Sequence, residues 1–459
     1  MHEKSLLRVI ATTTIDLMTG ISEQFSRLAG SRLLKNIGAN YIGAVLNTAL
    51  PLITLPIYLN HLGAENWGLV SFVAFFVSAL SILDAGFNQA LVKEFARVNV
   101  KKLTLNERNN NLLFGYERLY IGFALIIIFS VFPFTDQIVT HWLDLGSLPH
   151  NSGLLTLYCA CAMFLFQFPS SIYRTVLVAG QEQVLLNKIL SCVVVVRHAT
   201  SVLLVFYSHA IWVYLIWQVF CSATETIWLS RVAWIEVGVS RKQSHWDRAA
   251  MASTIRFALM MAISALLGAA TAMVDKFYIT GKLPIAQLGY YGIASSVSFG
   301  VLRLSYPVFT ALLPRLVQLQ SDAKFLLKIN LRLILIIVSG LALGAVIFML
   351  IGSEVLQFWL KNKTVADSVY PVLSLLLISS ALNVLYNLGY TNWIAAGASK
   401  IILTINLVSF IFAIVITPIA IDRFGLFGAA SALVIMNSIG AVTSLIWLAK
   451  CTIRRHSAS

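Results

Sequence analysis

Long apolar runs separated by short polar connections constrain this chain more than any other feature of its sequence. A helix needs about 20 apolar residues to cross a bilayer. Only 11% of the residues are charged, whereas a soluble domain usually has about a quarter. We therefore expect an all-α integral membrane protein with about 12 transmembrane helices and no large soluble domain. The runs occupy residues 37–59, 67–92, 112–134, 152–179, 184–206, 209–230, 254–279, 286–312, 329–351, 369–396, 401–421 and 425–449.

The basic residues predict how the chain is oriented. Lys and Arg concentrate in every second connection, such as 93–108 and 231–248, and are absent from the first, third and fifth connections. Because cytoplasmic loops carry the excess of Lys and Arg, both termini should be cytoplasmic and residues 135–151 should be external. We assign Lys276 and Lys282 to the external seventh connection. The net charge of +14 is therefore expected to anchor the chain among membrane lipids rather than to bind nucleic acid.

The same pattern divides the chain into two halves. Residues 1–35 lack the continuous apolar core of a signal peptide, so we expect a cytoplasmic N-terminal lead. The other predicted segments are an N-terminal six-helix lobe at 36–230, a cytoplasmic inter-lobe linker at 231–253, a C-terminal six-helix lobe at 254–450 and a cytoplasmic tail at 451–459.

A weak internal repeat supports the two-lobed interpretation. The sequence reads HLGAENWGLV at 61–70 and LPIAQLGYYGI at 283–293, six predicted helices later. Each segment places an aromatic-Gly-aliphatic turn at the start of a helix that runs towards the cytoplasm. Units separated by an even number of spans share one orientation, so we predict two pseudo-symmetric lobes related by an axis normal to the membrane. Chance similarity between Gly-rich membrane segments is the alternative.

Polar residues recur on single faces of several apolar helices. An unpaired polar group in lipid costs several kcal/mol, so these faces should look into protein or a water-filled cavity. Packing and hydrogen bonding between helices is the other explanation, and for the serines we prefer it. The residues that we predict to line a substrate cavity are Asp84, Arg303, Asn40, Asn47, Asn88, Arg256, Asp275, Tyr306, Asn383 and Asn387.

Asp84 and Arg303 are the strongest of these candidates because a charge deep in a span is costly without a partner or water. Arg197 and the neighbouring His198 form a second possible charge site. Arg174 and Glu225 lie near enough to the predicted cytoplasmic face to extend into it, so we interpret them as anchors.

The sequence carries no signature of an enzyme. It contains no Walker loop, no HExxH, no GxSxG and no carboxylate pair at metal-ligand spacing. The five cysteines have no CxxC spacing, which argues against a zinc site or a disulfide framework. We therefore expect a chain that is not an enzyme and that uses no cofactor and no metal.

Four segments resemble the opening of a polysaccharide exporter. They are LLKNIGANY at 33–41, the pair Pro51 and Pro56, HLGAENWG at 61–68 and LDAGF at 83–87. Together they are similar to the Wzx-like O-antigen flippases of the multidrug/oligosaccharidyl-lipid/polysaccharide (MOP) exporter superfamily. The likeness is strongest over residues 36–97, and helix count and topology extend it across 31–450.

The resemblance implies a V-shaped pair of six-helix lobes, similar to that of MATE transporters, in a bacterial inner membrane. Such an antiporter flips polyprenyl-diphosphate-linked oligosaccharide units for lipopolysaccharide biosynthesis. The resemblance further implies protons or Na⁺ as the coupling ion, and polymerase and chain-length proteins of the same pathway as possible partners. Asp84 matches the family's aspartate in the second helix, and Arg303 stands where an arginine that faces the cavity is expected in the eighth.

Several alternative functions remain open at this point. A related exporter could carry capsule, exopolysaccharide or enterobacterial common antigen units, the peptidoglycan lipid precursor, or small drugs. A drug exporter should have a more acidic, aromatic-lined cavity. A membrane glycan polymerase is the rival from a different class, and it should carry a sizeable external loop, which the 135–151 connection is too short to provide.

The predicted orientation can be tested with reporter fusions. A periplasmic reporter fused at residue 145 should be active, and one fused at residue 245 should be silent, because basic residues retain the 231–253 linker in the cytoplasm. The opposite activities at these two positions would overturn the twelve-span arrangement.

Overall fold

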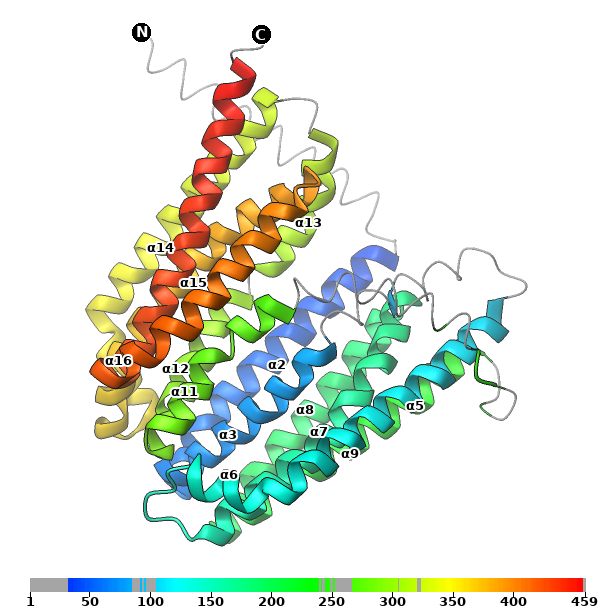
Figure 1. Cartoon of the computed structure of the whole chain (residues 1–459), viewed down its shortest axis with the longest axis vertical. Helices are drawn as coiled ribbons and strands as arrows, with labels where there is room; N and C mark the ends of the chain where they lie inside the picture. The colour runs from blue at the N-terminus through cyan, green and yellow to red at the C-terminus, as the bar shows by residue number, and fades with distance from the viewer. Residues whose placement is uncertain are drawn as a thin grey trace.

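Figure 1 shows the computed structural model of the chain, in which every regular element that is described is a helix. The structure describes residues 32–84, 91–92, 95, 105–238, 241, 244–247, 251, 266–303, 305–319 and 323–456. The predicted site residues Asn88 and Arg256, and most of the predicted N-terminal lead, lie outside this part.

The helices pack into two groups (Figure 1). The N-terminal lobe consists of α2 (Arg32–Leu62), α3 (Ala64–Ser81) with η1 (Ile82–Asp84), α5 (Leu105–Val131) with η2 (Phe132–Phe134) and α6 (Thr135–His141), α7 (His150–Ala179), α8 (Gln183–Ser208) and α9 (Ile211–Val237). The C-terminal lobe consists of α11 (Val274–Lys282), α12 (Ile285–Arg303), α13 (Tyr306–Gln318), α14 (Ala323–Leu360), α15 (Lys363–Ala395) and α16 (Ser399–His456).

Nine of the described helices are long and apolar enough to cross a membrane. One of them, α16, contains Gly425 with φ 55° and ψ −134°, a backbone conformation that favours glycine. There the chain reverses, so that the two halves of α16 run side by side (Figure 1). These observations confirm the predicted all-α fold with two lobes.

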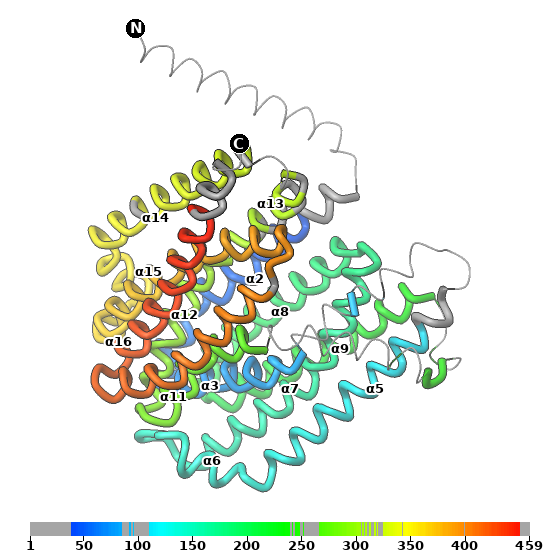
Figure 2. Tube along the Cα trace, turned by 45° about the horizontal axis from the view of Figure 1, so that its top comes forward, coloured from blue at the N-terminus to red at the C-terminus, as the bar shows by residue number. Residues whose placement is uncertain are grey.

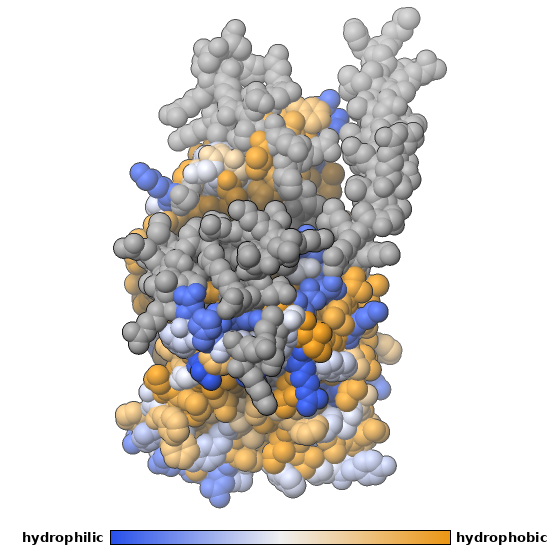
Figure 3. All heavy atoms as spheres, turned by 90° about the vertical axis from the view of Figure 1, so that its right-hand side faces the viewer, coloured by the Kyte–Doolittle hydropathy of each residue, from blue (hydrophilic) through white to orange (hydrophobic). Residues whose placement is uncertain are grey.

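The outer surface of the bundle is apolar. Tyr207, Phe129 and Phe358 are 88%, 72% and 83% exposed, and apolar residues cover much of the face drawn in Figure 3. α5 and α14 lie at opposite edges of the molecule in both Figure 1 and Figure 2. A soluble protein rarely exposes so much contiguous apolar surface, so this surface is suited to contact with lipid chains.

The eighth predicted run is two helices rather than one. α12 ends at Arg303 and α13 begins at Tyr306. Pro307 lacks the N–H that a continuous helix would donate to the carbonyl of Arg303, which explains the break. Arg303 is therefore the last residue of α12, and not an interior residue of one long helix as the sequence indicated.

The two lobes meet at the end where the α2–α3 and α11–α12 turns lie, and they separate towards the end that carries the last turns of α16 (Figure 1). At the closed end α3 packs directly on α12. A Cβ atom built on Gly68 would lie 2.1 Å from the carbonyl oxygen of Ile285, and one on Gly289 would lie 3.0 Å from the Gly68 nitrogen. The two segments of the predicted repeat thus contact each other across the lobes.

The connection between α6 and α7 reinforces this contact from the N-terminal lobe. The Ile285 N–H donates to the carbonyl of Asp144 at 2.8 Å. The Trp142 ring lies 5.1 Å from that of Phe277 and covers Gly281. On the other side, the Trp359 indole N–H at the end of α14 donates to the Leu52 carbonyl of α2 at 3.2 Å. Both lobes are therefore joined at several points at one end.

We predict that Gly68 is required for the closed end. Gly68→Ala should lower the midpoint of thermal unfolding of the purified protein, because its methyl group forces α3 away from Ile285, and overpacking of this kind costs about 1–3 kcal/mol. Gly344→Ala is the matched control, since nothing lies within 4 Å of a Cβ at that helical glycine. Equal midpoints for the two variants would contradict the close contact.

Candidate functional site

A cavity of about 490 Å³ lies between the two lobes. We call it the inter-lobe cavity. Its wall combines one face of α2 and α3 with the facing side of α11 and α12, and α8 and α9 each add one residue. The polar and charged residues that line it are Asn47, Thr48, Tyr58, Ser71, Ser78, His198, Tyr214, Lys276, Tyr291, Ser295, Ser296 and Arg303.

The charged residues of this wall are all cationic. Lys276 and Arg303 line the inter-lobe cavity, and the described residues of its lining include no Asp or Glu. Such a cavity attracts anions and repels cations.

Arg303 reaches this cavity from the C-terminal end of α12, where its side chain is exposed. Carbonyl groups without intrahelical partners make a helix C-terminus partly negative, which favours a cation there. The guanidinium keeps its charge at any physiological pH and presents several N–H donors in a plane. The residue therefore offers a fixed positive charge that can form paired hydrogen bonds.

Lys276 is the second cation of this wall, and its sequence position did not predict its place in the fold. The structure places it in the first turn of α11 rather than in an external connection, with a side chain only 14% exposed. Its ammonium group lies 3.2 Å from the Asp275 carboxylate and 5.6 Å from the ring centroids of Tyr291 and Phe299. The Tyr291 hydroxyl also donates to Asp275, at 2.6 Å. Lys276 is therefore a buried cation that is held by a carboxylate and two aromatic rings.

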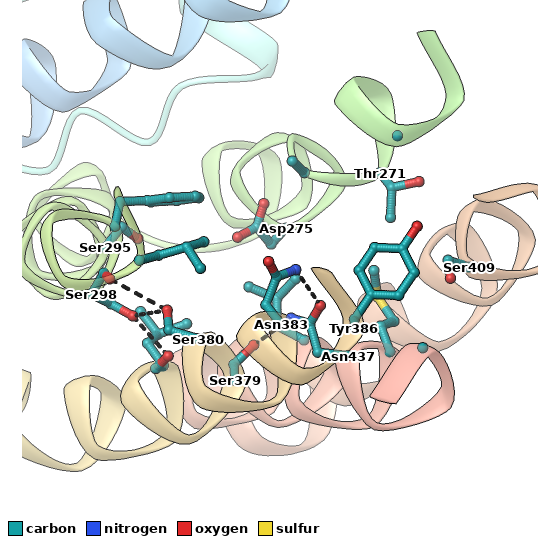
Figure 4. Close-up of a pocket in the computed structure, with 18 of the residues that line it drawn as sticks. Thr271, Asp275, Ser295, Ser298, Ser379, Ser380, Asn383, Tyr386, Ser409 and Asn437 are labelled. Carbon is teal, nitrogen blue, oxygen red and sulfur yellow. Dashed lines mark hydrogen bonds between the residues drawn. The ribbon is translucent and has the colours of Figure 1, made fainter. Parts of the chain in front are cut away.

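A second cavity, of about 190 Å³, lies inside the C-terminal lobe. We call it the C-lobe cavity. Lys276, Ser295 and Phe299 line both cavities, so the two adjoin at these residues. Asp275 and Asn383 also line the C-lobe cavity (Figure 4). Of the residues predicted from sequence, the structure thus brings Asn47 and Arg303 to the inter-lobe cavity, and Asp275 and Asn383 to the cavity beside it.

Asp84 occupies a different place in the fold. It ends η1, is 8% exposed, and accepts hydrogen bonds from the hydroxyls of Tyr120 in α5 and Ser171 in α7. It lines neither of the two cavities. Its carboxylate instead ties η1 to two neighbouring helices inside the N-terminal lobe.

Three other predicted residues that the structure describes also lie outside the two linings. Asn40 is exposed on α2 and exchanges hydrogen bonds with Gln183 and Asn187 of α8, at 3.0 and 2.6 Å. Asn387 donates to the side-chain oxygen of Asn383 at 2.7 Å, one turn along α15. Tyr306 begins α13 and is 46% exposed.

The N-terminal lobe contains a group of buried charges. Glu225, which is 8% exposed, forms ion pairs with Arg174 and with Arg197, the latter at 3.1 Å. The sequence analysis interpreted Arg174 and Glu225 as separate interfacial anchors, whereas they are paired. His198, beside Arg197, lies within hydrogen-bond distance of Thr54 and Tyr58, at 3.0 and 3.1 Å. These contacts connect α7, α8 and α9, and they join α8 to α2.

A protein-family model matches more than half of the chain. The model of the family described as "Polysaccharide biosynthesis protein" matches residues 33–320. A search of curated proteins gives no match.

Several solved structures share the fold. The lipid II flippase MurJ in an inward closed conformation is 13% identical, with a TM-score of 0.72 over 92% of this chain and 90% of its own. An inward-facing multidrug resistance MATE transporter of the MOP superfamily is 12% identical, with a TM-score of 0.67 over 91% and 96%. A mutant of the Vibrio cholerae MATE transporter VcmN is 13% identical, with a TM-score of 0.62 over 93% and 97%. The chain has the fold of MOP superfamily transporters.

The buried ion pair of Asp275 and Lys276 yields a prediction on stability. Lys276→Met should destabilise the protein by about 3 kcal/mol, because it leaves a buried carboxylate without its cation. The double variant Asp275→Asn with Lys276→Met should recover most of that loss. Thermal unfolding of the purified variants measures both effects.

Lys282→Met is the control on the same helix. Lys282 pairs with Asp422, whose side chain is 59% exposed, and exposed pairs contribute at most about 1 kcal/mol. A Lys276 variant that is no less stable than the Lys282 variant would show that the buried pair does not form.

Proposed function

This chain belongs to the polysaccharide biosynthesis protein family, and we propose that it flips polyprenyl-diphosphate-linked oligosaccharide units, of the O-antigen type, across the bacterial inner membrane. The observation that carries this proposal is the charge of the inter-lobe cavity, whose two charged lining residues are Lys276 and Arg303. A diphosphate head group is anionic, and it must be neutralised to enter a membrane interior.

The chemistry of the cavity wall fits such a head group. A guanidinium binds phosphate oxygens through paired hydrogen bonds, and an ammonium adds a compact point charge. The hydroxyls of Ser71, Ser78 and Ser296 and the carboxamide of Asn47 can bind sugar hydroxyls. The lipid tail need not enter the cavity, since it can remain in the bilayer while the head group crosses between the lobes.

The shape of the molecule supports transport by alternating access. The lobes are joined at the end that holds Gly68 and Trp142 and separate towards the other end. With both termini in the cytoplasm, as the basic residues predict, this is the state that accepts substrate from the cytoplasmic side. A proton or Na⁺ gradient would drive the return, and we assign Asp84, inside the N-terminal lobe, to the coupling step.

The cationic lining of the inter-lobe cavity argues against the export of cationic drugs. The described part of the wall has two cations and no carboxylate, and such a wall would repel these molecules. The peptidoglycan precursor also carries a diphosphate, and the lipid II flippase MurJ shares this fold. A deletion strain distinguishes these two substrates. The lipid that accumulates on its cytoplasmic leaflet, either the lipid-linked oligosaccharide or the peptidoglycan precursor, is the one that the protein transports.

We predict that Arg303 binds the diphosphate. In a deletion strain, Arg303→Ala should abolish complementation of surface glycan, whereas Arg303→Lys, which keeps the charge but loses the planar fork, should retain part of it. The measurement is surface glycan per amount of protein in the membrane.

The second readout, membrane abundance, distinguishes binding from folding. Because Arg303 is exposed at a helix end, both variants should reach the abundance of the unaltered protein. Full complementation by Arg303→Ala at normal abundance would overturn the assignment of Arg303 to substrate binding.

A further inference from the structure

The C-lobe cavity is a polar chamber beside the proposed diphosphate site. Thr271 and Asp275 line it near α11, Ser295 and Ser298 on α12, and Ser379 and Asn383 on α15 (Figure 4). α16 completes the wall with the residues Asn406, Ser409 and Asn437. A cavity whose lining is rich in hydroxyls and carboxamides is unfavourable when empty in a membrane protein, because each group must be hydrogen-bonded.

Part of this hydrogen-bonding capacity is already used to orient the wall. Asn383 donates to the side-chain oxygen of Asn437 at 2.8 Å, and Asn437 donates to the Ser379 hydroxyl at 2.7 Å. Each of these carboxamide nitrogens carries two N–H groups, so one on each remains for a ligand within the described part of the chain. The wall is thus pre-organised, which lowers the entropy cost of binding.

Two hydroxyls face the cavity without a role in the wall. Ser295 and Ser409 line it, and among the described residues neither hydroxyl has a hydrogen-bond partner. Ser295 stands at the junction with the inter-lobe cavity, and Ser409 lies on the α16 side, next to the Tyr386 ring (Figure 4). Donors and acceptors are therefore available at both ends of the chamber.

We propose that the C-lobe cavity is a subsite for one neutral sugar, the pyranose unit that is bonded directly to the diphosphate. This inference rests on the proposed function. Hydroxyl and carboxamide groups are the partners that sugar hydroxyls require. The volume of about 190 Å³ admits one ring and not an oligosaccharide, so the remaining sugars stay in the inter-lobe cavity.

The position of Lys276 identifies which sugar is bound. Its ammonium lies at the junction of the two cavities, where it can contact a phosphate that is held in the inter-lobe cavity. The sugar bonded to that phosphate is the unit that reaches past Ser295 and Phe299 into the C-lobe cavity. Asp275, the carboxylate of this cavity, is paired with Lys276, so the described lining of the chamber has no unpaired cation for an acidic sugar.

The test compares defined lipids on the full-length protein in nanodiscs. The probes are a polyprenyl diphosphate without sugar, the same lipid with one N-acetylglucosamine or glucose, and the same lipid with one glucuronic acid. The unaltered protein should bind a neutral-sugar lipid about tenfold more tightly than the bare lipid, the equivalent of one or two hydrogen bonds. Preference for the glucuronic acid lipid would overturn the neutral class.

Two variants locate the preference in the C-lobe cavity. Ser409→Leu fills the chamber without removing a hydrogen bond of the wall, and Asn437→Ala removes a carboxamide. Both should bind the sugar lipid no more tightly than the bare lipid, with affinity for the bare lipid unchanged. Thr404→Leu, at an exposed position on the same helix, is the matched control and should keep the preference.

The remaining outcomes are distinct. If the unaltered protein binds bare and sugar-bearing lipids equally, the subsite is overturned while the proposed function stands. If the variants lose affinity for all lipids alike, the cavity is part of the fold and holds no sugar. If the unaltered protein binds none of the diphosphate lipids, the proposed function itself fails, and the subsite fails with it.

Discussion

The high cost of burying charge in a membrane interior governs this structure. A charged side chain there needs a partner of opposite charge, hydrogen bonds or water. Glu225 meets this requirement with Arg174 and Arg197, Asp84 with two hydroxyls, and Asp275 with Lys276. Arg303 alone among the charges discussed here faces a cavity from an exposed position. Pairing therefore holds the helices of each lobe together, whereas Arg303 has no acidic partner among the described residues.

Close backbone contact is the second requirement, because lipid chains provide no hydrophobic force between helices. Gly68 and Gly289 let α3 and α12 approach until main-chain atoms of the two lobes meet. The contact is confined to one end, while the cavity extends along α2 and α12 behind it. Two lobes that are joined at one end can rock against each other about that end, and alternating access needs only such a motion.

Sequence reasoning could predict the fold because the apolar runs and the alternating basic connections reflect the membrane directly. It could also find Asn47, Arg303, Asp275 and Asn383, since a periodic polar face implies a neighbour or water. It could not tell which polar residues face a cavity. Asp84 and Asn40 lie on the same kind of polar face as the lining residues, but they form hydrogen bonds with neighbouring helices instead. Lys276 was missed because it lies near the end of an apolar run, where a lysine normally belongs to the connection. The adjacent Asp275 was the available signal, since paired opposite charges can remain inside a span.

The two cations of the inter-lobe cavity differ in how they are held, and this difference matters for a transporter. Among the described residues Arg303 has no acidic partner, and the carbonyls at the end of α12 offset its charge, whereas the charge of Lys276 is balanced by Asp275 at 3.2 Å. A substrate site must bind well enough to load and weakly enough to release, as in any conduction pathway. Two unpaired cations in a medium of low dielectric constant would hold a diphosphate strongly. Because Asp275 competes with the substrate for Lys276, the attraction between the two cations and the diphosphate is weaker. The same pair of cations can therefore bind the proposed head group on one side of the membrane and release it on the other.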